Sequence, residues 1–280
     1  MKNKLILIIA IILFSNLIYS QKFDYYYNKG QSNFDSLDFK HAILYYDSAL
    51  SFNPKHANSY FNRGLSKSLS HDNKEAITDF TSYIDLVPNA EDGYIMRGEC
   101  KEDVGDTIGC LNDYDSSVIL APNNIEARIK KGRILYLLDS LKLSLLEFNF
   151  AYYLDTNDIS AIYFKGINHL YMDEYDSAFK YLNLSIKLDT GHVYKGFYSR
   201  SKCKYYMNDY DNALKDINEA IKLDSNYAEN YYIRALIYIY NDNEYDDFLG
   251  EDDLNSASQL GSEEAKILLL EYFSEDGENY

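Results

Sequence analysis

The sequence predicts an all-α fold, a right-handed superhelical α-solenoid of stacked helical hairpins, and three observations support this. The only three prolines in the chain stand 34 residues apart, at Pro54, Pro88 and Pro122. Glycines recur at the same 34-residue interval, at Gly30, Gly64, Gly98, Gly132 and Gly166. The stretch NDYDNALKDINEAIKLDSN at 208–226 shares nine of nineteen positions with DEYDSAFKYLNLSIKLDTG, 35 residues earlier. A fixed period of this length is typical of a stacked array and not of an ordinary globular core.

Each repeat is predicted to be a pair of helices. Within 208–226 the apolar side chains are spaced close to i, i+3, i+4, i+7, which indicates an amphipathic helix that Asp209 can cap. Residues 197–206 form a second helical segment, and 207–209 form the turn between the two. A small residue follows each glycine after twelve positions, at Ala42, Ala76, Cys110, Ser144 and Ala178. These small side chains are expected to let the two helices approach closely.

This pattern resembles the tetratricopeptide repeat family, which has small residues at positions 8, 20 and 27, aromatics at 4 and 24, and Pro at 32. With repeats numbered from Phe23, position 24 holds Tyr46, Phe80, Tyr114, Phe148, Leu182 and Ile217. The resemblance covers about residues 23–270, which include the repeat array, placed at 21–260, and most of the segment that follows it. It implies about seven repeats, at 23–56, 57–90, 91–124, 125–158, 159–193, 194–227 and 228–261.

The two ends of the chain are expected to differ from the array. Residues 1–20 combine Lys2 and Lys4 with an apolar run of ten from Leu5 to Phe14, which predicts a secretory signal peptide and export. An uncleaved membrane anchor is the alternative. Residues 262–273 are predicted to form a capping helix, and 274–280 a polar tail.

The seventh repeat is interrupted by an acidic insertion, NDNEYDDFLGEDD at 241–253. Clustered carboxylates can bind Ca²⁺, but the EF-hand pattern requires Gly where Asp247 stands. A solvated charged insertion is therefore the preferred interpretation.

Composition and motifs exclude several classes of function. With a net charge of −17 and no basic stripe, nucleic acid is a poor candidate partner, and so is an anionic membrane once a signal peptide is removed. No catalytic motif or metal-ligand spacing is present, so we expect no enzyme, cofactor or metal. An enzyme on a solenoid scaffold would need a cluster of titratable groups. Cys100, Cys110 and Cys203 are expected to be buried core residues, with a Cys100–Cys110 bridge as the alternative.

The resemblance implies a concave groove lined by positions 2, 5, 9, 12 and 13 of the first helices. Those positions give an aromatic set, Arg133, Tyr136, Tyr163, Tyr171, Tyr198, Lys202, Tyr205, Tyr206, Tyr232 and Tyr240. The third repeat gives an acidic set, Asp92, Glu99, Glu102 and Asp103. Tyrosine is ordinary at positions 5 and 12 of the family but less expected at position 13, where Tyr171, Tyr206 and Tyr240 stand.

These residues favour a non-catalytic scaffold or adaptor that binds a protein or peptide segment. A groove running from acidic to aromatic would complement a basic and apolar peptide. The carboxylate clamp of chaperone-binding relatives is disfavoured, because only Asn62 fits it while Tyr27, Asp92 and Met96 occupy other clamp positions. The alternative is a structural subunit of a cell-envelope complex that assembles through the convex face. The oligomeric state stays open.

Overall fold

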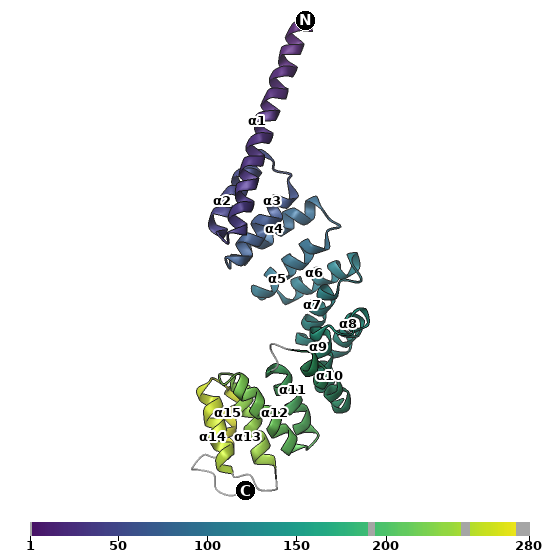
Figure 1. Ribbon diagram of the computed structural model, residues 1–280, viewed down its shortest axis with the longest axis vertical. Coiled ribbons are helices and arrows are strands. Elements are labelled where there is room, and N and C mark those ends of the chain that lie inside the picture. Colours follow the sequence, from purple (N-terminus) through teal and green to yellow (C-terminus); the bar gives the residue numbers. More distant parts are fainter. Residues whose placement is uncertain (1, 190–193, 242–246, 273–280) are drawn as a thin grey trace. The chain divides into compact units, whose positions relative to one another are not determined.

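The computed structural model describes residues 2–189, 194–241 and 247–272. All regular structure in these ranges is helical, which confirms the predicted all-α solenoid. The fifteen helices, consistent with about seven repeats, divide between two compact units, Met1–Ile134 and Leu135–Tyr280, here called the first and second unit. Each unit is a stack of helical hairpins (Figure 1).

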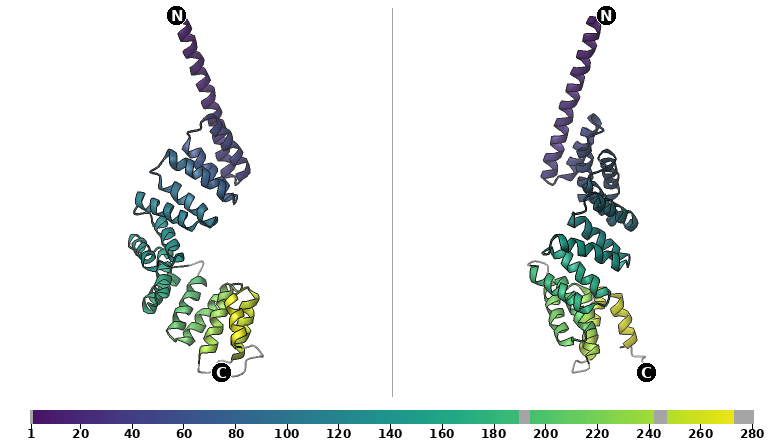
Figure 2. Two further views of the ribbon diagram at one scale, coloured as in Figure 1. Left: turned by 180° about the vertical axis from the view of Figure 1, so that it is seen from behind. Right: turned by 90° about the vertical axis from the view of Figure 1, so that its right-hand side faces the viewer.

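The helices follow one another as first and second members of hairpins. The first unit contains α1 (Lys2–Asp35), α2 (Phe39–Phe52), α3 (Ala57–Leu69), α4 (Asn73–Leu86), α5 (Glu91–Asp103), α6 (Thr107–Leu120) and most of α7 (Ile125–Leu137). The second unit contains α8 (Leu141–Leu154), α9 (Ile159–Tyr171), α10 (Tyr175–Leu188), α11 (Tyr194–Tyr206), α12 (Tyr210–Leu223), α13 (Ala228–Tyr240), α14 (Asp247–Gln259) and α15 (Glu263–Tyr272). Figure 2 shows both stacks from two further sides.

The helix α1 is longer than a repeat requires. It runs without a break from Lys2 to Asp35, so residues 2–20 continue into the first helix of the first repeat. Its N-terminal part extends beyond the hairpins of the first unit (Figure 1). Among the described residues, no helix combines the length and apolar character that crossing a membrane requires.

In six of the hairpins, one residue with left-handed backbone makes the turn between the two helices. Positive φ angles occur at the same place in six successive hairpins, at Leu37, His71, Gly105, Asp139, Asp173 and Asn208. Gly261 has the same conformation between α14 and α15. Since left-handed backbone favours Gly, Asn and Asp, most of these residues suit the turn, but Leu37 does not.

The recurring glycines make room for the side chain at position 24. A Cβ atom on Gly98 would lie 2.7 Å from the Tyr114 ring, and one on Gly64 would lie 3.0 Å from Phe80. Both rings are fully buried in the centre of their hairpins. The glycines therefore accommodate a large side chain from the second helix, in addition to bringing the two helix backbones together.

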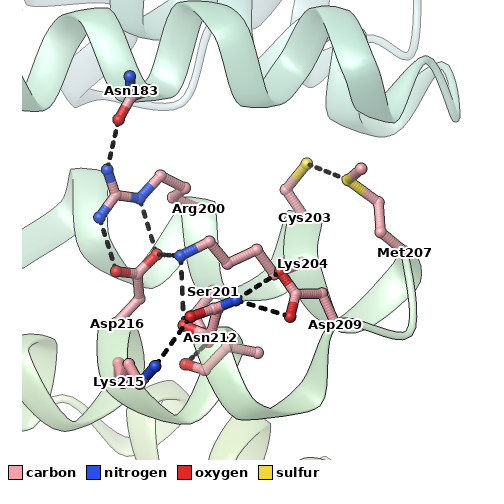
Figure 3. A network of polar contacts seen from close by, with 11 residues as sticks. Asn183, Arg200, Ser201, Cys203, Lys204, Met207, Asp209, Asn212, Lys215 and Asp216 are labelled. Carbon is pink, nitrogen blue, oxygen red and sulfur yellow. Dashed lines mark hydrogen bonds and ion pairs between the residues drawn. The ribbon is translucent and has the colours of Figure 1, made fainter.

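A buried ionic network ties several hairpins to the preceding one. Figure 3 shows it around Arg200, whose Nε and Nη2 donate to both oxygens of Asp216 in the same hairpin. Its Nη1 donates across to Asn183 of the preceding hairpin at 2.7 Å. Lys204, one turn further along α11, lies 2.8 Å from the same Asp216 carboxylate. One guanidinium thus holds three helices in register.

The same network recurs in other hairpins. Arg63 and Arg97 pair with Asp79 and Asp113 in the same way, and each reaches back to the preceding hairpin. Lys67 and Lys101 take the place of Lys204, at 2.8 Å from those carboxylates. Because each carboxylate is buried, its charge is compensated by two cations that come from one face of the first helix.

The fifth repeat replaces this ion pair with an aromatic sandwich. Lys165 occupies the place of Arg200, and Tyr181 occupies the place of Asp216. The Lys165 Nζ lies 4.1 Å from the centre of the Tyr181 ring and 4.6 Å from that of Tyr152. The buried ammonium is therefore stabilised by two ring faces instead of a carboxylate.

The structure corrects two details of the sequence analysis. Asp209 stands at the N-cap of α12, but its side chain makes no hydrogen bond to a backbone N–H. Its carboxylate instead accepts from the Asn212 side chain at 2.9 and 3.1 Å (Figure 3). A side-chain cap of the kind expected at Asp209 does occur at the start of α15, where the Ser262 hydroxyl accepts from the Ala265 N–H.

The acidic insertion is the second detail. Within the segment 241–253 that was expected to be solvated, α14 begins at Asp247; Phe248, Leu249 and Asp252 are exposed, but Asp253 departs from the expectation. Asp253 is buried and accepts from the Nε and Nη2 of Arg234 at 2.7 and 2.8 Å, so it replaces the position-23 aspartate of the other hairpins. Asp242, Glu244 and Asp246, which the calcium alternative also needs, lie outside the described residues.

Candidate partner-binding surface

The first helices of the second unit display a continuous set of tyrosines. Because α9 contacts α11 and α11 contacts α13, residues at equivalent places line up along one face. We call this face the tyrosine surface, and its predicted members are Tyr136, Tyr163, Tyr171, Tyr198, Lys202, Tyr205, Tyr206, Tyr232 and Tyr240.

Ring contacts link these side chains from one helix to the next. The rings of Tyr136 and Tyr171 meet edge to face, with centroids 5.3 Å apart. The Lys202 ammonium lies 4.8 Å from the centre of the Tyr171 ring and donates to its hydroxyl at 3.4 Å. Further along, Tyr205 contacts Tyr240 across α11 and α13, with centroids 6.4 Å apart. These contacts hold the aromatic rings in fixed orientations. The side chains therefore lose less conformational entropy when a ligand binds to them.

Two classes of tyrosine can be separated by exposure. Tyr171, Tyr206 and Tyr240, all at position 13, are 49, 45 and 43% exposed. Tyr163 and Tyr198, at position 5, are half-buried, and burial raises the pKa of both phenols. The position-5 rings therefore form the wall of the surface, and the position-13 rings project from it.

The charge state of the phenols follows from their surroundings. Burial and the neighbouring Tyr240 raise the pKa of Tyr205 to about 12, so it stays a neutral hydrogen-bond donor at physiological pH. Tyr171 differs: burial raises its pKa, but the hydrogen bond with Tyr136 and the Lys202 ammonium outweigh burial and lower it. Lys202 thus polarises the most exposed phenol of the surface.

Sequence reasoning missed three members of this surface. Tyr194 and Tyr227 lie outside the groove positions of the family, yet the Tyr198 and Tyr227 rings meet at 5.5 Å and the Tyr194 and Tyr227 rings at 6.4 Å. Glu229 stands at position 2 of the seventh repeat, a groove position that could have identified it. Burial and then Glu264 raise the pKa of its carboxyl.

The acidic set lies in the first unit, and its members already have partners. Glu99 forms an ion pair with Lys130, and Glu102 accepts from Arg133 at 3.2 Å. Asp103 accepts from the Asn73 side chain at 2.9 Å. The remaining acid, Asp92, accepts from the Tyr83 hydroxyl at 3.1 Å. Arg133 therefore belongs with this acidic set and not with the tyrosines. Lys130 and Arg133 offset the charges of Glu99 and Glu102, whereas the exposed Asp92 and Asp103 accept from neutral groups and keep their negative charge.

A small cavity borders the tyrosine surface at Tyr163. Its volume is about 160 Å³. It is lined by Ile159, Ser160, Tyr163, Phe164, Ser185, Ile186, Asp189, Lys195 and Gly196. This volume is below the roughly 300–1,000 Å³ of small-molecule sites and suits a single side chain.

The described residues offer little for metal or thiol chemistry. No group of three or more His, Cys, Asp or Glu side chains in these ranges could hold a metal ion. The three cysteines are free and buried, so the alternative Cys100–Cys110 bridge is not formed. Burial raises the pKa of Cys110 and Cys203 to about 11, which keeps both thiols protonated and unreactive.

Comparison with known proteins identifies the repeats. The tetratricopeptide repeat profile matches residues 23–56 and 194–227. No curated protein matches the sequence.

Solved structures show the same fold. A tetratricopeptide repeat protein from Parabacteroides merdae has a TM-score of 0.71 at 20% identity, covering 89% of this chain and 98% of that one. PilF of Pseudomonas aeruginosa has a TM-score of 0.65 at 14% identity, covering 78% and 98%. YrrB, described as having an unusual peptide-binding site, has a TM-score of 0.56 at 19% identity, covering 66% and 95%.

Proposed function

Because the chain is built from tetratricopeptide repeats, we propose that it is a scaffold or adaptor that binds a protein or peptide segment on its tyrosine surface. The observation that carries this proposal is the row of exposed position-13 tyrosines, one on each of α9, α11 and α13. Proteins of this fold serve as protein–protein interaction scaffolds, and YrrB has a peptide-binding site.

The chemistry of the surface favours an apolar or aromatic ligand. Tyrosine rings offer large apolar faces at low entropy cost, and their neutral hydroxyls can bond to peptide backbone groups. Lys202 adds one cation and Glu229 one partly buried acid. A basic ligand would find two of the four acids of the third repeat, Glu99 and Glu102, already paired with Lys130 and Arg133.

The proposed mechanism is binding without chemistry. A peptide would lie across α9, α11 and α13 and place one side chain into the cavity beside Tyr163. The half-buried Tyr163 and Tyr198 would support the contact, while Tyr171, Tyr206 and Tyr240 would contribute most of its area.

The test begins with chemical cross-linking in the native host and mass spectrometry of captured partners. Combined substitution of Tyr171, Tyr206 and Tyr240 by Ala should reduce capture at least tenfold, since residues in the centre of an interface each contribute about 1–2 kcal/mol or more. The matched control replaces three similarly exposed residues outside the groove positions, Tyr25, Leu44 and Leu223, by Ala. Unchanged capture by the triple tyrosine variant would overturn the assignment of this surface.

A second measurement tests the ligand chemistry. Selection from a displayed peptide library should enrich aromatic and aliphatic sequences, and the triple tyrosine variant should lose this enrichment. Enrichment of Lys-rich and Arg-rich sequences instead would contradict the proposed ligand and favour a basic peptide.

We also propose that residues 1–20 direct export of the chain. The support is the positive start at Lys2 and Lys4 followed by the apolar run from Leu5 to Phe14. A fusion of residues 1–25 to a reporter that is active only after export should be active, and replacing Leu7, Ile9 and Ile11 by Asn should abolish that activity. An inactive wild-type fusion would contradict the proposal that residues 1–20 direct export.

A further inference from the structure

The outer face of α8 carries an exposed apolar stripe. Its members recur at intervals of three and four residues, so they lie on one side of the helix, at Leu143, Leu146, Phe150 and Tyr153. Their exposed fractions range from 39% for Phe150 to 79% for Tyr153. We call these four residues the α8 stripe.

Packing of the repeat does not require this stripe. The α8 stripe occupies positions 19, 22, 26 and 29 of the fourth repeat. The same four positions of the sixth repeat, on α12, hold Asn212, Lys215, Glu219 and Lys222. Because two hairpins of one fold carry opposite chemistry at these places, the apolar side chains of α8 serve something other than the hairpin itself.

The neighbouring helix gives the stripe a positive border. The rings of Tyr152 and Tyr181 meet at 5.9 Å, which places α10 beside α8. Lys180 and Lys187 stand at positions 22 and 29 of α10, and both are exposed, as is Lys142 on α8. Of the two acids on these helices, Glu147 stands at position 23, and the exposed Asp176 stands at position 18, the place that Lys142 has on α8, so the border holds three lysines and one acid. In a chain of net charge −17, this border is locally basic.

The last described helix has the complementary chemistry. One face of α15 packs into the array through Ala265, Leu268 and Leu269. Ile267 and Leu270 point away from this contact, with exposed fractions of 56 and 70%. Three glutamates flank them and are also exposed, at Glu263, Glu264 and Glu271; Lys266 pairs with Glu263, which leaves Glu264 and Glu271 as the acids in excess. The helix is therefore acidic, with a second apolar face that the described part of its own chain leaves exposed.

We propose that α15 of one copy of this protein docks on the α8 stripe of a second copy. Ile267 and Leu270 would lie against Leu143 and Leu146, while the glutamates of α15 would face Lys180 and Lys187. This pairing joins apolar to apolar and acid to base. Its residues are not members of the tyrosine surface and it does not rest on the proposed peptide binding, although Glu264 and Glu271 border that surface at Tyr232.

Charge favours this head-to-tail arrangement over a symmetric one. If two α8 stripes met each other, the lysines of both copies would be brought together and would repel. Two different faces give a heterologous contact, in which each added copy presents a new free face. A single helix against two helices buries less than the roughly 1,200 Å² of a stable interface, so the association should be weak and concentration-dependent.

The test uses two differently tagged full-length chains expressed together. The stripe variant carries Leu146→Glu and Tyr153→Glu. The α15 variant carries Ile267→Glu and Leu270→Glu. We expect wild-type chains to co-purify. Two stripe variants, or two α15 variants, should lose at least nine-tenths of this signal. A stripe variant paired with an α15 variant should co-purify, because one intact contact remains. The matched control, Asn212→Glu with Lys222→Glu on α12, should behave as wild type.

A disulfide measurement keeps the proposal testable if a glutamate variant fails to fold. Chains carrying Leu146→Cys and chains carrying Leu270→Cys should cross-link with each other under mild oxidation, and neither should cross-link with itself. The proposal is overturned if wild-type chains do not co-purify, or if each cysteine variant cross-links only with itself. Copies that associate while this cross-link fails to form would also overturn it, because they would meet through another surface.

Discussion

Asp216 lies buried between two cations of α11: it accepts from Arg200 at 2.7 and 2.6 Å and lies 2.8 Å from Lys204. A carboxylate at this depth is tolerated only because both cations and their hydrogen bonds compensate for its desolvation. The arrangement fixes the angle between α11 and α12, and Arg200 extends it to α10 through Asn183. Since neighbouring first helices carry the tyrosine surface, these networks also set the spacing of its rings.

Replacing Asp216 by Ala should therefore destabilise the second unit strongly. Two partly buried cations would lose their shared counter-ion, and breaking a buried pair in this way costs about 3–5 kcal/mol. Urea unfolding followed by circular dichroism measures the loss. The control is Glu219→Ala, which removes an exposed ion pair with Lys222 and should change stability by no more than about 0.5 kcal/mol. Equal effects of the two substitutions would contradict the role given to the network.

Replacing Leu37 by Gly should stabilise the first unit. Leu37 has φ of 61°, a conformation that costs an ordinary side chain about 1–2 kcal/mol and glycine almost nothing. The side chain is exposed, so little packing is lost. Because glycine also has more freedom in the unfolded chain, we expect a net gain of about 0.5–1 kcal/mol. Thermal unfolding measures it. Gly105→Ala, at φ of 82° in the equivalent turn, should shift the melting temperature in the opposite direction.

Alkaline pH should weaken the contact between α4 and α5 through Tyr83. Burial and the nearby Asp92 raise the pKa of Tyr83 to about 12, above the value near 10 of an unfolded chain. Because the phenol ionises more readily in the unfolded chain, the contribution of Tyr83 to the free energy of unfolding is present in full below pH 10. It is lost as the pH rises towards 12. Melting temperatures from pH 8 to 11.5 should fall less steeply for Tyr83→Phe than for the wild type. Tyr153→Phe, at an exposed site, should follow the wild-type curve.

The sequence predicted most of the fold because one period repeats in it. Proline and glycine spacing located the hairpins, since the same packing problem recurs in each. It did not predict that Asp253 is buried, because Arg234, its partner, stands 19 residues away and the intervening acids resemble a solvated loop. The Arg–Asp network could have been found: Arg63, Arg97 and Arg200 each stand 16 residues before an aspartate.

The candidate site was only partly predictable. Groove positions located Tyr171, Tyr206 and Tyr240 from the repeat register alone. Their exposure, and the half-burial of Tyr163 and Tyr198, depend on neighbouring helices that a single repeat does not contain. The partners of the acidic set were not predictable for the same reason, since Lys130 and Arg133 approach Glu99 and Glu102 from the next hairpin.

The ionic network should be transferable to the fifth repeat, which lacks it. Lys165→Arg with Tyr181→Asp would recreate the pair formed by Arg200 and Asp216, and Asn149 of the preceding hairpin stands at the place of Asn183. Tyr181→Asp alone should destabilise the second unit, because it removes a ring from the Lys165 ammonium and buries a carboxylate held by one cation. The double variant should recover about 0.5–3 kcal/mol of that loss, the range found for residues in one network.

A double-mutant cycle by urea unfolding measures this coupling. The matched cycle combines Lys222→Arg with Glu219→Asp on the exposed face of α12, where the two effects should add to within about 0.5 kcal/mol. If the Lys165 and Tyr181 substitutions were equally additive, the guanidinium would not be pairing with the new carboxylate. The geometry of each hairpin would then depend on its own packing, and the Arg–Asp pairs would be a consequence of helix register instead of its cause.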